Sequence, residues 1–276
     1  MIPAPFDYQR AASVDEAIGL LTEHGDEAKL LAGGHSLLPL MKLRLAAPAV
    51  LVDIGRIADL SYVTSGGDGT VRIGALTRHH QLTTSAELRD EVPLLAHVAA
   101  QVGDPQVRHR GTIGGSVVHG DPASDLPAAL LALRATLVAR GPRGTREIAV
   151  DDFFTGFLET ALADDEVLTE IRVPARPGAG WAFEKFNRRA QDWAIVGVAA
   201  VLGDGAEPGV GLVNMGSAPL RAAGVEDALR AGAPAPEAAA RADEGTEPPD
   251  DLNASPEYRR HLAQVLVRRA IETANG

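Results

Sequence analysis

Two glycine-rich segments hold the residue types best suited to binding an anionic ligand. The first is Ala32-Gly33-Gly34-His35-Ser36, between a short apolar run and a segment with helical spacing, and the second is Gly111-Thr112-Ile113-Gly114-Gly115-Ser116. Paired glycines let a ligand approach the backbone closely, and the amide N–H groups at a following helix start, with the Ser36 hydroxyl, can donate to a phosphate. Two such segments suit a ligand with two phosphates, although each alone is more often a tight turn or a packing contact.

Two charged residues have a possible role beside such a ligand. Asp125 precedes an apolar helical run, where a carboxylate can accept hydrogen bonds from sugar-like hydroxyls or can simply offset the helix dipole. Lys185 lies in the alternating segment WAFEKF, where it either points inward to an anionic or carbonyl partner or is a solvated strand lysine. The residues alone leave these alternatives open.

Several standard catalytic and nucleotide-binding motifs are absent. Neither glycine segment has the G-x-G-x-x-G spacing, there is no P-loop, and Gly34–Leu38 lacks the last glycine of the G-x-S-x-G nucleophile elbow. His79-His80 and His119-Gly120-Asp121 do not have metal-ligand spacing, so these histidines are expected to be solvated or packed in the core. We predict no catalytic residue and no metal ligand in this chain.

The composition excludes further classes of function. With 26 Lys and Arg against 37 Asp and Glu, the net charge of the 276 residues is −11, which disfavours nucleic acid as a partner. The chain has no cysteine, which excludes disulfides, thiolate zinc sites and iron–sulfur clusters held by its own side chains. No basic, apolar leader begins the sequence, and no apolar window approaches about 18 residues. We therefore expect a cytoplasmic protein without a membrane span.

Hydrophobic spacing predicts two α/β lobes in the first two-thirds of the chain. In the lobe of residues 1–55, Ser13 and Glu16 form a capping box for a helix over 14–24, and the apolar runs 28–32 and 49–54 are buried strands. The lobe of residues 56–176 follows. Its predicted elements are hairpins over 61–76 and 136–150, helices from 77, over 94–102 and over 125–133, and a strand over 166–173.

Residues 175–180 are the best linker candidate. After them, three strand-like runs, 181–186, 194–202 and 209–216, predict an antiparallel sheet. The Pro-, Ala- and acid-rich stretch 231–250 is expected to be an exposed loop. Ser255-Pro256 then begins a final helix, with Tyr258, Leu262, Val265, Leu266 and Ala270 on one face.

Five segments in series resemble one known family. They are AGGHS at 32–36, GTIGGS at 111–116, PASDLPAAL at 122–130, VLTEIRVP at 167–174 and EKFNRRAQDWAIVGVAA at 184–200. In this order they are similar to the FAD-binding medium subunits of the molybdenum hydroxylases, the family of xanthine dehydrogenase and aerobic carbon monoxide dehydrogenase. The likeness covers nearly the whole chain, and His35 is a variant that favours the carbon monoxide dehydrogenase type.

The resemblance implies an α+β fold: a two-lobed FAD-binding domain of the vanillyl-alcohol-oxidase type over 1–176, followed by a smaller α+β domain over 177–276. It also implies that the following residues contact FAD: Ala32, Gly33, Gly34, His35, Ser36, Thr112, Ile113, Gly114, Gly115 and Ser116 at the pyrophosphate; Asp125 at the ribityl or ribose hydroxyls; Val107 and Gly111 along the cleft; Leu168, Lys185 and Trp193 near the ring system. The family's second motif commonly ends in Asn, so Ser116 is expected to anchor the cofactor less strongly.

The implied role is electron transfer within a larger complex. FAD would receive electrons from [2Fe-2S] clusters on a small partner subunit, while a large subunit with the molybdenum cofactor oxidises the substrate; a dimer of such heterotrimers is implied. The acceptor could be a quinone, NAD, oxygen or another carrier. Carbon monoxide is the leading substrate, with nitrogen heterocycles, aldehydes and aromatic thioesters as alternatives. A self-contained flavoenzyme and a non-catalytic nucleotide-binding module are the competing interpretations.

Overall fold

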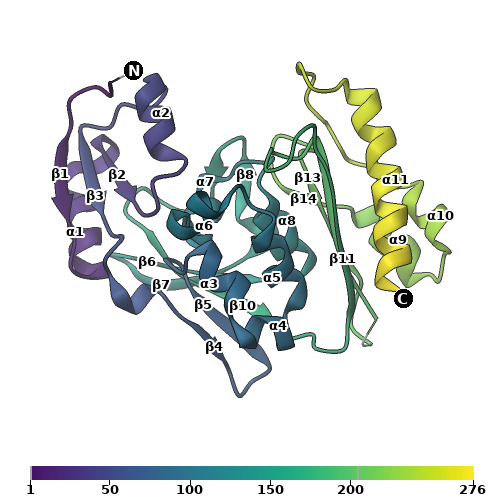
Figure 1. Ribbon diagram of the computed structural model, residues 1–276. Coiled ribbons are helices and arrows are strands. Elements are labelled where there is room, and N and C mark those ends of the chain that lie inside the picture. Colours follow the sequence, from purple (N-terminus) through teal and green to yellow (C-terminus); the bar gives the residue numbers. More distant parts are fainter. Residues whose placement is uncertain (1, 204) are drawn as a thin grey trace.

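The computed structural model describes residues 2–203 and 205–276. Figure 1 shows three parts in chain order: a small lobe, a central helical region on a twisted sheet, and a C-terminal sheet covered by one long helix. The apolar side chains form three cores: one centred on the small lobe, one shared by the central region and the inner face of the C-terminal sheet, and one between the outer face of that sheet and its helices. The structure thus has the predicted α+β class.

The small lobe is a three-stranded parallel sheet in the order β1-β3-β2. Its elements are β1 (Asp7–Arg10), α1 (Val14–His24), β2 (Ala28–Leu31), α2 (Leu37–Leu43) and β3 (Val50–Asp53). Helix α1 begins as predicted, because the Ser13 hydroxyl accepts a hydrogen bond from the Glu16 amide, while the Glu16 carboxylate accepts one from the Ala12 amide. Strand β1 was not predicted from the sequence.

The central region is a five-stranded antiparallel sheet in the order β4-β5-β10-β6-β7, covered by short helices. Both predicted hairpins and the strand near 166–173 are confirmed. The strands are β4 (Val63–Ser65), β5 (Thr70–Gly74), β6 (Thr136–Gly141), β7 (Gly144–Ala149) and β10 (Val167–Pro174), with a small β8 (Phe154–Gly156) and β9 (Glu159–Thr160) pair. The helices are α3 (His79–Thr84), α4 (Ala86–Glu91), α5 (Pro93–Ala100), α6 (Pro105–Arg110), α7 (Ile113–His119) and α8 (Asp125–Ala132).

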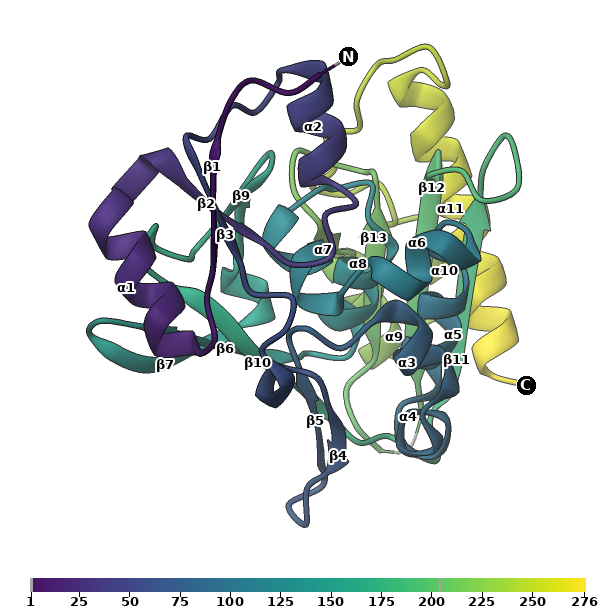
Figure 2. The ribbon, with the colours of Figure 1, turned by 60° about the vertical axis from the view of Figure 1, so that its left-hand side comes forward.

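The C-terminal part is an antiparallel sheet in the order β11-β12-β13-β14, with helices on its outer face. The predicted three strands are confirmed, and a short fourth strand joins them. The elements are β11 (Gly180–Phe186), β12 (Val196–Leu202), β13 (Gly209–Val213), β14 (Leu220–Arg221), α9 (Ala223–Arg230), α10 (Ala235–Ala239) and α11 (Pro256–Ala274). Figure 2, turned by 60°, shows α11 again on the side of this sheet that faces away from the small lobe.

For the C-terminal part, one expectation was wrong and another was confirmed only in part. The stretch 231–250 is not simply an exposed loop, because it contains α10 and buries Ala238 and Ala242 against α9 and α11. The expected inner face of α11 is confirmed at Leu262, Leu266 and Ala270, but Tyr258 is exposed and Arg259 is buried. Burial of Arg259 could not be expected from spacing. Its guanidinium donates to the Ile195 carbonyl and the Asp251 carboxylate.

Helix α8 joins the central and C-terminal parts. All eight of its residues are buried, since it packs against α5 and α7 of the central region and against β13 of the C-terminal sheet. Gly209 and Gly211 in β13 make this possible, because a Cβ atom would lie 1.9 Å from the Ala132 carbonyl oxygen or 2.0 Å from that of Ala128. No side chain fits there, so the helix rests directly on the strand backbone.

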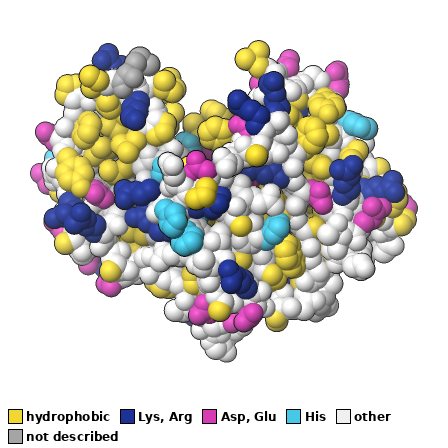
Figure 3. Space-filling model, viewed as in Figure 1, with side chains coloured by type: hydrophobic (Ala, Val, Ile, Leu, Met, Phe, Trp, Pro, Cys, Tyr) yellow, Lys and Arg dark blue, Asp and Glu magenta, His cyan; other side chains and the backbone are white. Residues whose placement is uncertain are grey.

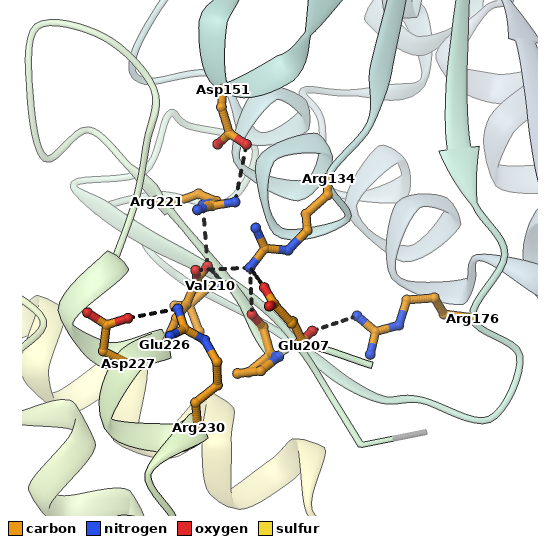
Figure 4. A network of polar contacts seen from close by, with 10 residues as sticks. Arg134, Asp151, Arg176, Glu207, Val210, Arg221, Glu226, Asp227 and Arg230 are labelled. Atoms are coloured by element: carbon orange, nitrogen blue, oxygen red, sulfur yellow. Dashed lines mark hydrogen bonds and ion pairs between the residues drawn. The ribbon is translucent and has the colours of Figure 1, made fainter. Parts of the chain in front are cut away.

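A polar network also links the central and C-terminal parts beside α8 (Figure 4). The Glu226 carboxylate is fully buried and accepts a hydrogen bond from the Val210 amide at 2.9 Å. Arg134, after α8, donates to it at 3.3 Å, and Arg221 lies 3.6 Å away and pairs with Asp151. Burial raises the pKa of Glu226, whereas the Val210 amide and the two arginines lower it. The network therefore connects Arg134 and Asp151, which precede the linker 175–180, with Arg221 and Glu226, which follow it.

We predict that Glu226→Ala is less stable than Glu226→Gln by about 1–3 kcal/mol, because alanine leaves the buried Val210 N–H without an acceptor while glutamine keeps an oxygen there. Urea unfolding followed by circular dichroism measures the difference. Equal midpoints for the two variants would contradict this role of the hydrogen bond.

Candidate functional site

The two glycine segments lie against each other in the structure. The loop 32–36 connects β2 to α2, and the second segment connects α6 to α7. A Cβ atom on Gly33 would lie 2.4 Å from the Arg110 carbonyl oxygen and 2.9 Å from the Gly111 Cα. The backbones are therefore in contact at a place where only glycine fits. This contact brings the small lobe and the central region together at one site.

The first segment presents unused hydrogen-bond donors. Within the described residues, the amide N–H groups of 33–36 have no acceptor, and neither does the Ser36 hydroxyl. Gly34 has φ +76°, a left-handed conformation that favours glycine. Successive free amides beside such a residue are a common way for a backbone to bind an anion, so a phosphate contact here stays a prediction.

In the second segment, 111–116, most amide groups already donate to acceptors within the chain. Thr112 caps α7 by accepting from the Gly115 amide, and the amides of Ile113, Gly114 and Ser116 donate to other carbonyls of the chain. The two segments therefore differ in this conformation, because most amides of the second already have acceptors within the chain. Its glycines serve close packing instead, since a Cβ on Gly114 would lie 2.6 Å from the Ala75 carbonyl oxygen.

Ser116 forms a hydroxyl pair. Its Oγ lies 2.8 Å from the Oγ of Ser124, the residue before α8. In a pair of hydroxyls only one hydrogen is used between the two oxygens, so the other remains available to a ligand. The serine at this position thus keeps a donor and links α7 to the start of α8.

Asp125 and Lys185 form a buried ion pair. Lys185, on β11, donates to the Asp125 Oδ2 at 2.7 Å and to the Gln101 carbonyl at 3.3 Å, and both side chains are under 8% exposed. Lys185 therefore points inward rather than into solvent. Burial raises the pKa of Asp125 to about 6, with Lys185 opposing the shift. The second oxygen, Oδ1, has no partner among the described residues.

The remaining expected site residues lie at different depths. Val107 is half-buried in α6, whose start Asp104 caps. Leu168 is buried in β10, the strand against which α7 packs. Trp193, in the loop after β11, is 69% exposed and lines a cavity of about 640 Å³ together with Phe157 and the segment 121–123. Trp193 does not touch the glycine segments in the described structure.

Sequence reasoning missed His79 as part of this site. The side chain is buried, its ring lies where a Cβ on Gly111 would come within 2.6 Å, and its backbone amide donates to the Gly111 carbonyl. Burial lowers the pKa of His79 to about 4, and nearby His35 adds to this shift. His79 is a core residue as expected, but its Nδ1 has no described partner. No sequence pattern joins position 79 to position 111.

Comparisons with known proteins identify the family. Residues 4–176 match the model of the FAD binding domain in molybdopterin dehydrogenase, and residues 181–274 match the CO dehydrogenase flavoprotein C-terminal domain. The chain belongs to the FAD-binding medium subunits of the molybdenum hydroxylases. It is 43% identical to the carbon monoxide dehydrogenase medium chain of Hydrogenophaga pseudoflava, over 99% of this chain and 98% of that one.

A second relative and a solved structure support the same family. The 6-hydroxypseudooxynicotine dehydrogenase complex subunit alpha of Paenarthrobacter nicotinovorans is 37% identical, over 99% of this chain and 96% of its own. A solved chain of the Hydrogenophaga pseudoflava carbon monoxide dehydrogenase superposes with a TM-score of 0.94 at 43% identity, covering 99% of this chain and 98% of that chain. The family is thus shown to be that of FAD-dependent oxidoreductase subunits, most like the carbon monoxide dehydrogenase type.

The described residues form neither a membrane-spanning helix nor a cluster of metal ligands. Across residues 2–203 and 205–276, no helix combines the length and apolar character needed to cross a membrane. In the same ranges, no three His, Asp or Glu side chains are grouped so that they could hold a metal ion.

We predict that Gly33→Ala weakens FAD binding at least about tenfold, because the new Cβ would overlap the Arg110 carbonyl and displace the loop with the free amides. Gly67→Ala is the matched control, since nothing lies within 4 Å of a Cβ there. Fluorescence titration of the cofactor-free protein with FAD measures both. Unchanged affinity in Gly33→Ala would contradict the site.

We predict that Lys185→Met lowers the free energy of unfolding by about 3–5 kcal/mol, because it leaves the buried Asp125 carboxylate without its counter-ion. Adding Asp125→Asn should restore most of this loss, since both charges are then gone. The exposed Lys29→Met is the control, with a change below about 0.5 kcal/mol. Urea unfolding of Lys185→Met, Asp125→Asn, the double variant and Lys29→Met measures these free energies. If the loss in the double variant equals the sum of the two single losses, the two side chains are not coupled.

Proposed function

We propose that this chain binds FAD in the cleft between the two glycine segments and passes electrons from a partner's iron–sulfur clusters to an external acceptor. The observation that carries the proposal is the run of free amides at 33–36, pressed by Gly33 against the second segment. Such a run of free donors suits a pyrophosphate. The family membership supports FAD as its source.

The residues present fit this cofactor. We assign the pyrophosphate to 32–36, with the hydroxyls and close-packed glycines of 112–116 forming the opposite wall. The unpartnered Oδ1 of Asp125 can accept a hydrogen bond from a ribityl or ribose hydroxyl, and Lys185 holds this carboxylate in place. Val107, Gly111, Leu168 and Trp193 are assigned to the cleft and the ring system.

FAD, when bound, supplies a group that accepts single electrons and releases a pair. The chain's own part is to hold the cofactor and set the charge around it. Lys185 and Asp125 together place a compensated charge pair beside the cleft, and their burial excludes water from it. We assign no residue of this chain as the acid or base of substrate hydroxylation.

The electron donor must be another chain, because this one has no cysteine for iron–sulfur clusters. We propose a small subunit with two [2Fe-2S] clusters and a large subunit with the molybdenum cofactor, assembled as a dimer of heterotrimers in the cytoplasm. Carbon monoxide is the proposed substrate, on the strength of the 43% identity to a carbon monoxide dehydrogenase medium chain. We propose 1–176 and 177–276 as the two domains.

The complex isolated from its own cell tests the proposal. We expect one releasable FAD per copy of this chain, in company with an iron–sulfur chain and a molybdenum chain. Addition of carbon monoxide without oxygen should bleach the flavin absorbance near 450 nm after the iron–sulfur signals have changed. The order of these two events is the evidence for relay through the flavin.

Two outcomes would contradict parts of the proposal. A lone flavin-loaded chain with its own turnover would favour a self-contained flavoenzyme. Bleaching by a nitrogen heterocycle or an aldehyde, but not by carbon monoxide, would keep the relay and replace the substrate. In the same assay, the complex with Gly33→Ala should lose the flavin signal, and the complex with Gly67→Ala is its control.

A further inference from the structure

Asn214, the first residue after β13, has an unusual backbone conformation. Its φ of +62° lies in the left-handed region, which residues other than glycine rarely adopt, although asparagine tolerates it better than most. Such a conformation persists where the surrounding contacts enforce it. The contacts of Asn214 therefore show what this conformation serves.

Asn214 makes hydrogen bonds with two segments that lie far from it in the sequence. Its backbone N–H donates to the Pro122 carbonyl at 2.7 Å. Its side-chain Nδ2 donates to the Ala194 carbonyl at 3.0 Å and to the Ile195 carbonyl at 3.4 Å. The one residue thus bridges the chain that enters α8 and the loop that precedes β12.

Each of these segments carries a residue that we assign to the cofactor. Pro122 precedes Asp125 by three residues, and Ala194 directly follows Trp193. The first of the two assigned residues is on the central region, and the second is on the C-terminal part. Their relative position therefore depends on what connects the two segments, and Asn214 makes that connection directly.

Further bonds hold the base of the loop 187–195. The Ile195 N–H donates to the Phe186 carbonyl at 2.7 Å, which closes the loop. The guanidinium of Arg259, which is fully buried, donates to the Ile195 carbonyl and, at 2.7 Å, to the Asp251 carboxylate. The end of the loop next to Trp193 is therefore fixed from the side of α11 as well.

Trp193 itself has little side-chain packing to hold it. The side chain is 69% exposed, whereas Ala194 and Ile195 after it are buried. Trp193, Asn214 and Pro122 all line the cavity of about 640 Å³, and Figure 3 shows the molecule hollowed between the small lobe and the C-terminal part. The place of the exposed ring is thus set by the backbone that carries it, which Asn214 holds.

We propose that Asn214 is a positioning residue for the cofactor, which fixes Trp193 relative to Asp125 so that both contact one bound FAD. This rests on the proposed function, which assigns those two residues to FAD. A turn after β13 would not by itself need asparagine, because glycine adopts the left-handed conformation without strain. The side chain is used instead for the two carbonyls that follow Trp193.

The first test follows Trp193 in the full chain without cofactor. Trp181→Phe leaves Trp193 as the one tryptophan, because the sequence has two. In this background, Asn214→Gly keeps a residue suited to φ +62° and removes the Nδ2 donor. We expect it to lower the fluorescence anisotropy of Trp193, since the loop then moves more freely.

Gln191→Gly is the matched control. Gln191 is in the same loop, is exposed and also has a left-handed backbone, with φ +69°, but its side chain makes no hydrogen bond within 2–203 or 205–276. The control adds the same flexibility without removing a bond. An anisotropy that falls as far in Gln191→Gly as in Asn214→Gly would overturn the role of the Asn214 side chain.

The second test measures how fast the complete complex releases FAD, from the appearance of free flavin fluorescence. We expect Asn214→Gly to release FAD about two- to tenfold faster, with Gln191→Gly unchanged. Because Asn214 acts through Trp193, the same substitution should add little in a Trp193→Ala complex. Asn214→Asp, which keeps the shape of the side chain but lacks the donor, should act in the same direction and replaces Asn214→Gly if that variant does not assemble.

Three outcomes would count against a part of this account. Equal acceleration by Asn214→Gly with and without Trp193 would overturn the proposal, because Asn214 would then act by another route. Release that Trp193→Ala leaves unchanged would remove Trp193 from the cofactor site, and the proposed role of Asn214 with it. Absence of FAD from the unmodified complex would instead overturn the proposed function, so the failures are distinguishable.

Discussion

The direct packing of α8 on the backbone of β13 is the contact on which the rest of the structure depends. Gly209 and Gly211 leave no side chain between helix and strand, so the distance between the central and C-terminal parts is fixed by backbone atoms. Close packing of this kind tolerates little displacement. It also places β11, two strands away in the same sheet, opposite the start of α8.

The charge pair at the site follows from that placement. Lys185 is on β11 and Asp125 is the first residue of α8, so their 2.7 Å contact exists only while helix and sheet keep this spacing. The Glu226 network holds the opposite end of α8 through Arg134. One end of the helix is therefore held by the Glu226 network, and the other end carries the Asp125 carboxylate of the buried ion pair.

The sequence predicted those features whose causes are local. The helix over 14–24 depends on Ser13 and Glu16, and the hairpin over 61–76 depends on its own glycine turn, so both were found. Features that depend on contacts between residues far apart in the sequence were not predicted. Spacing could not show that Lys185 meets Asp125, that His79 lies beside Gly111, or that Gly33 touches Arg110, because each pair is far apart in sequence. Arg259 was left out of the buried face of α11 because a buried arginine does not follow apolar spacing.

Full burial of α8 has a consequence for how the central and C-terminal parts depend on each other. A helix whose residues Asp125 to Ala132 are all covered has no face suited to water, and β13 covers one of its sides. Residues 1–176 produced alone would expose that side, together with the Asp125 carboxylate that Lys185 neutralises. The two parts therefore depend on each other to cover the apolar surface of α8, and each is expected to need the other in order to fold.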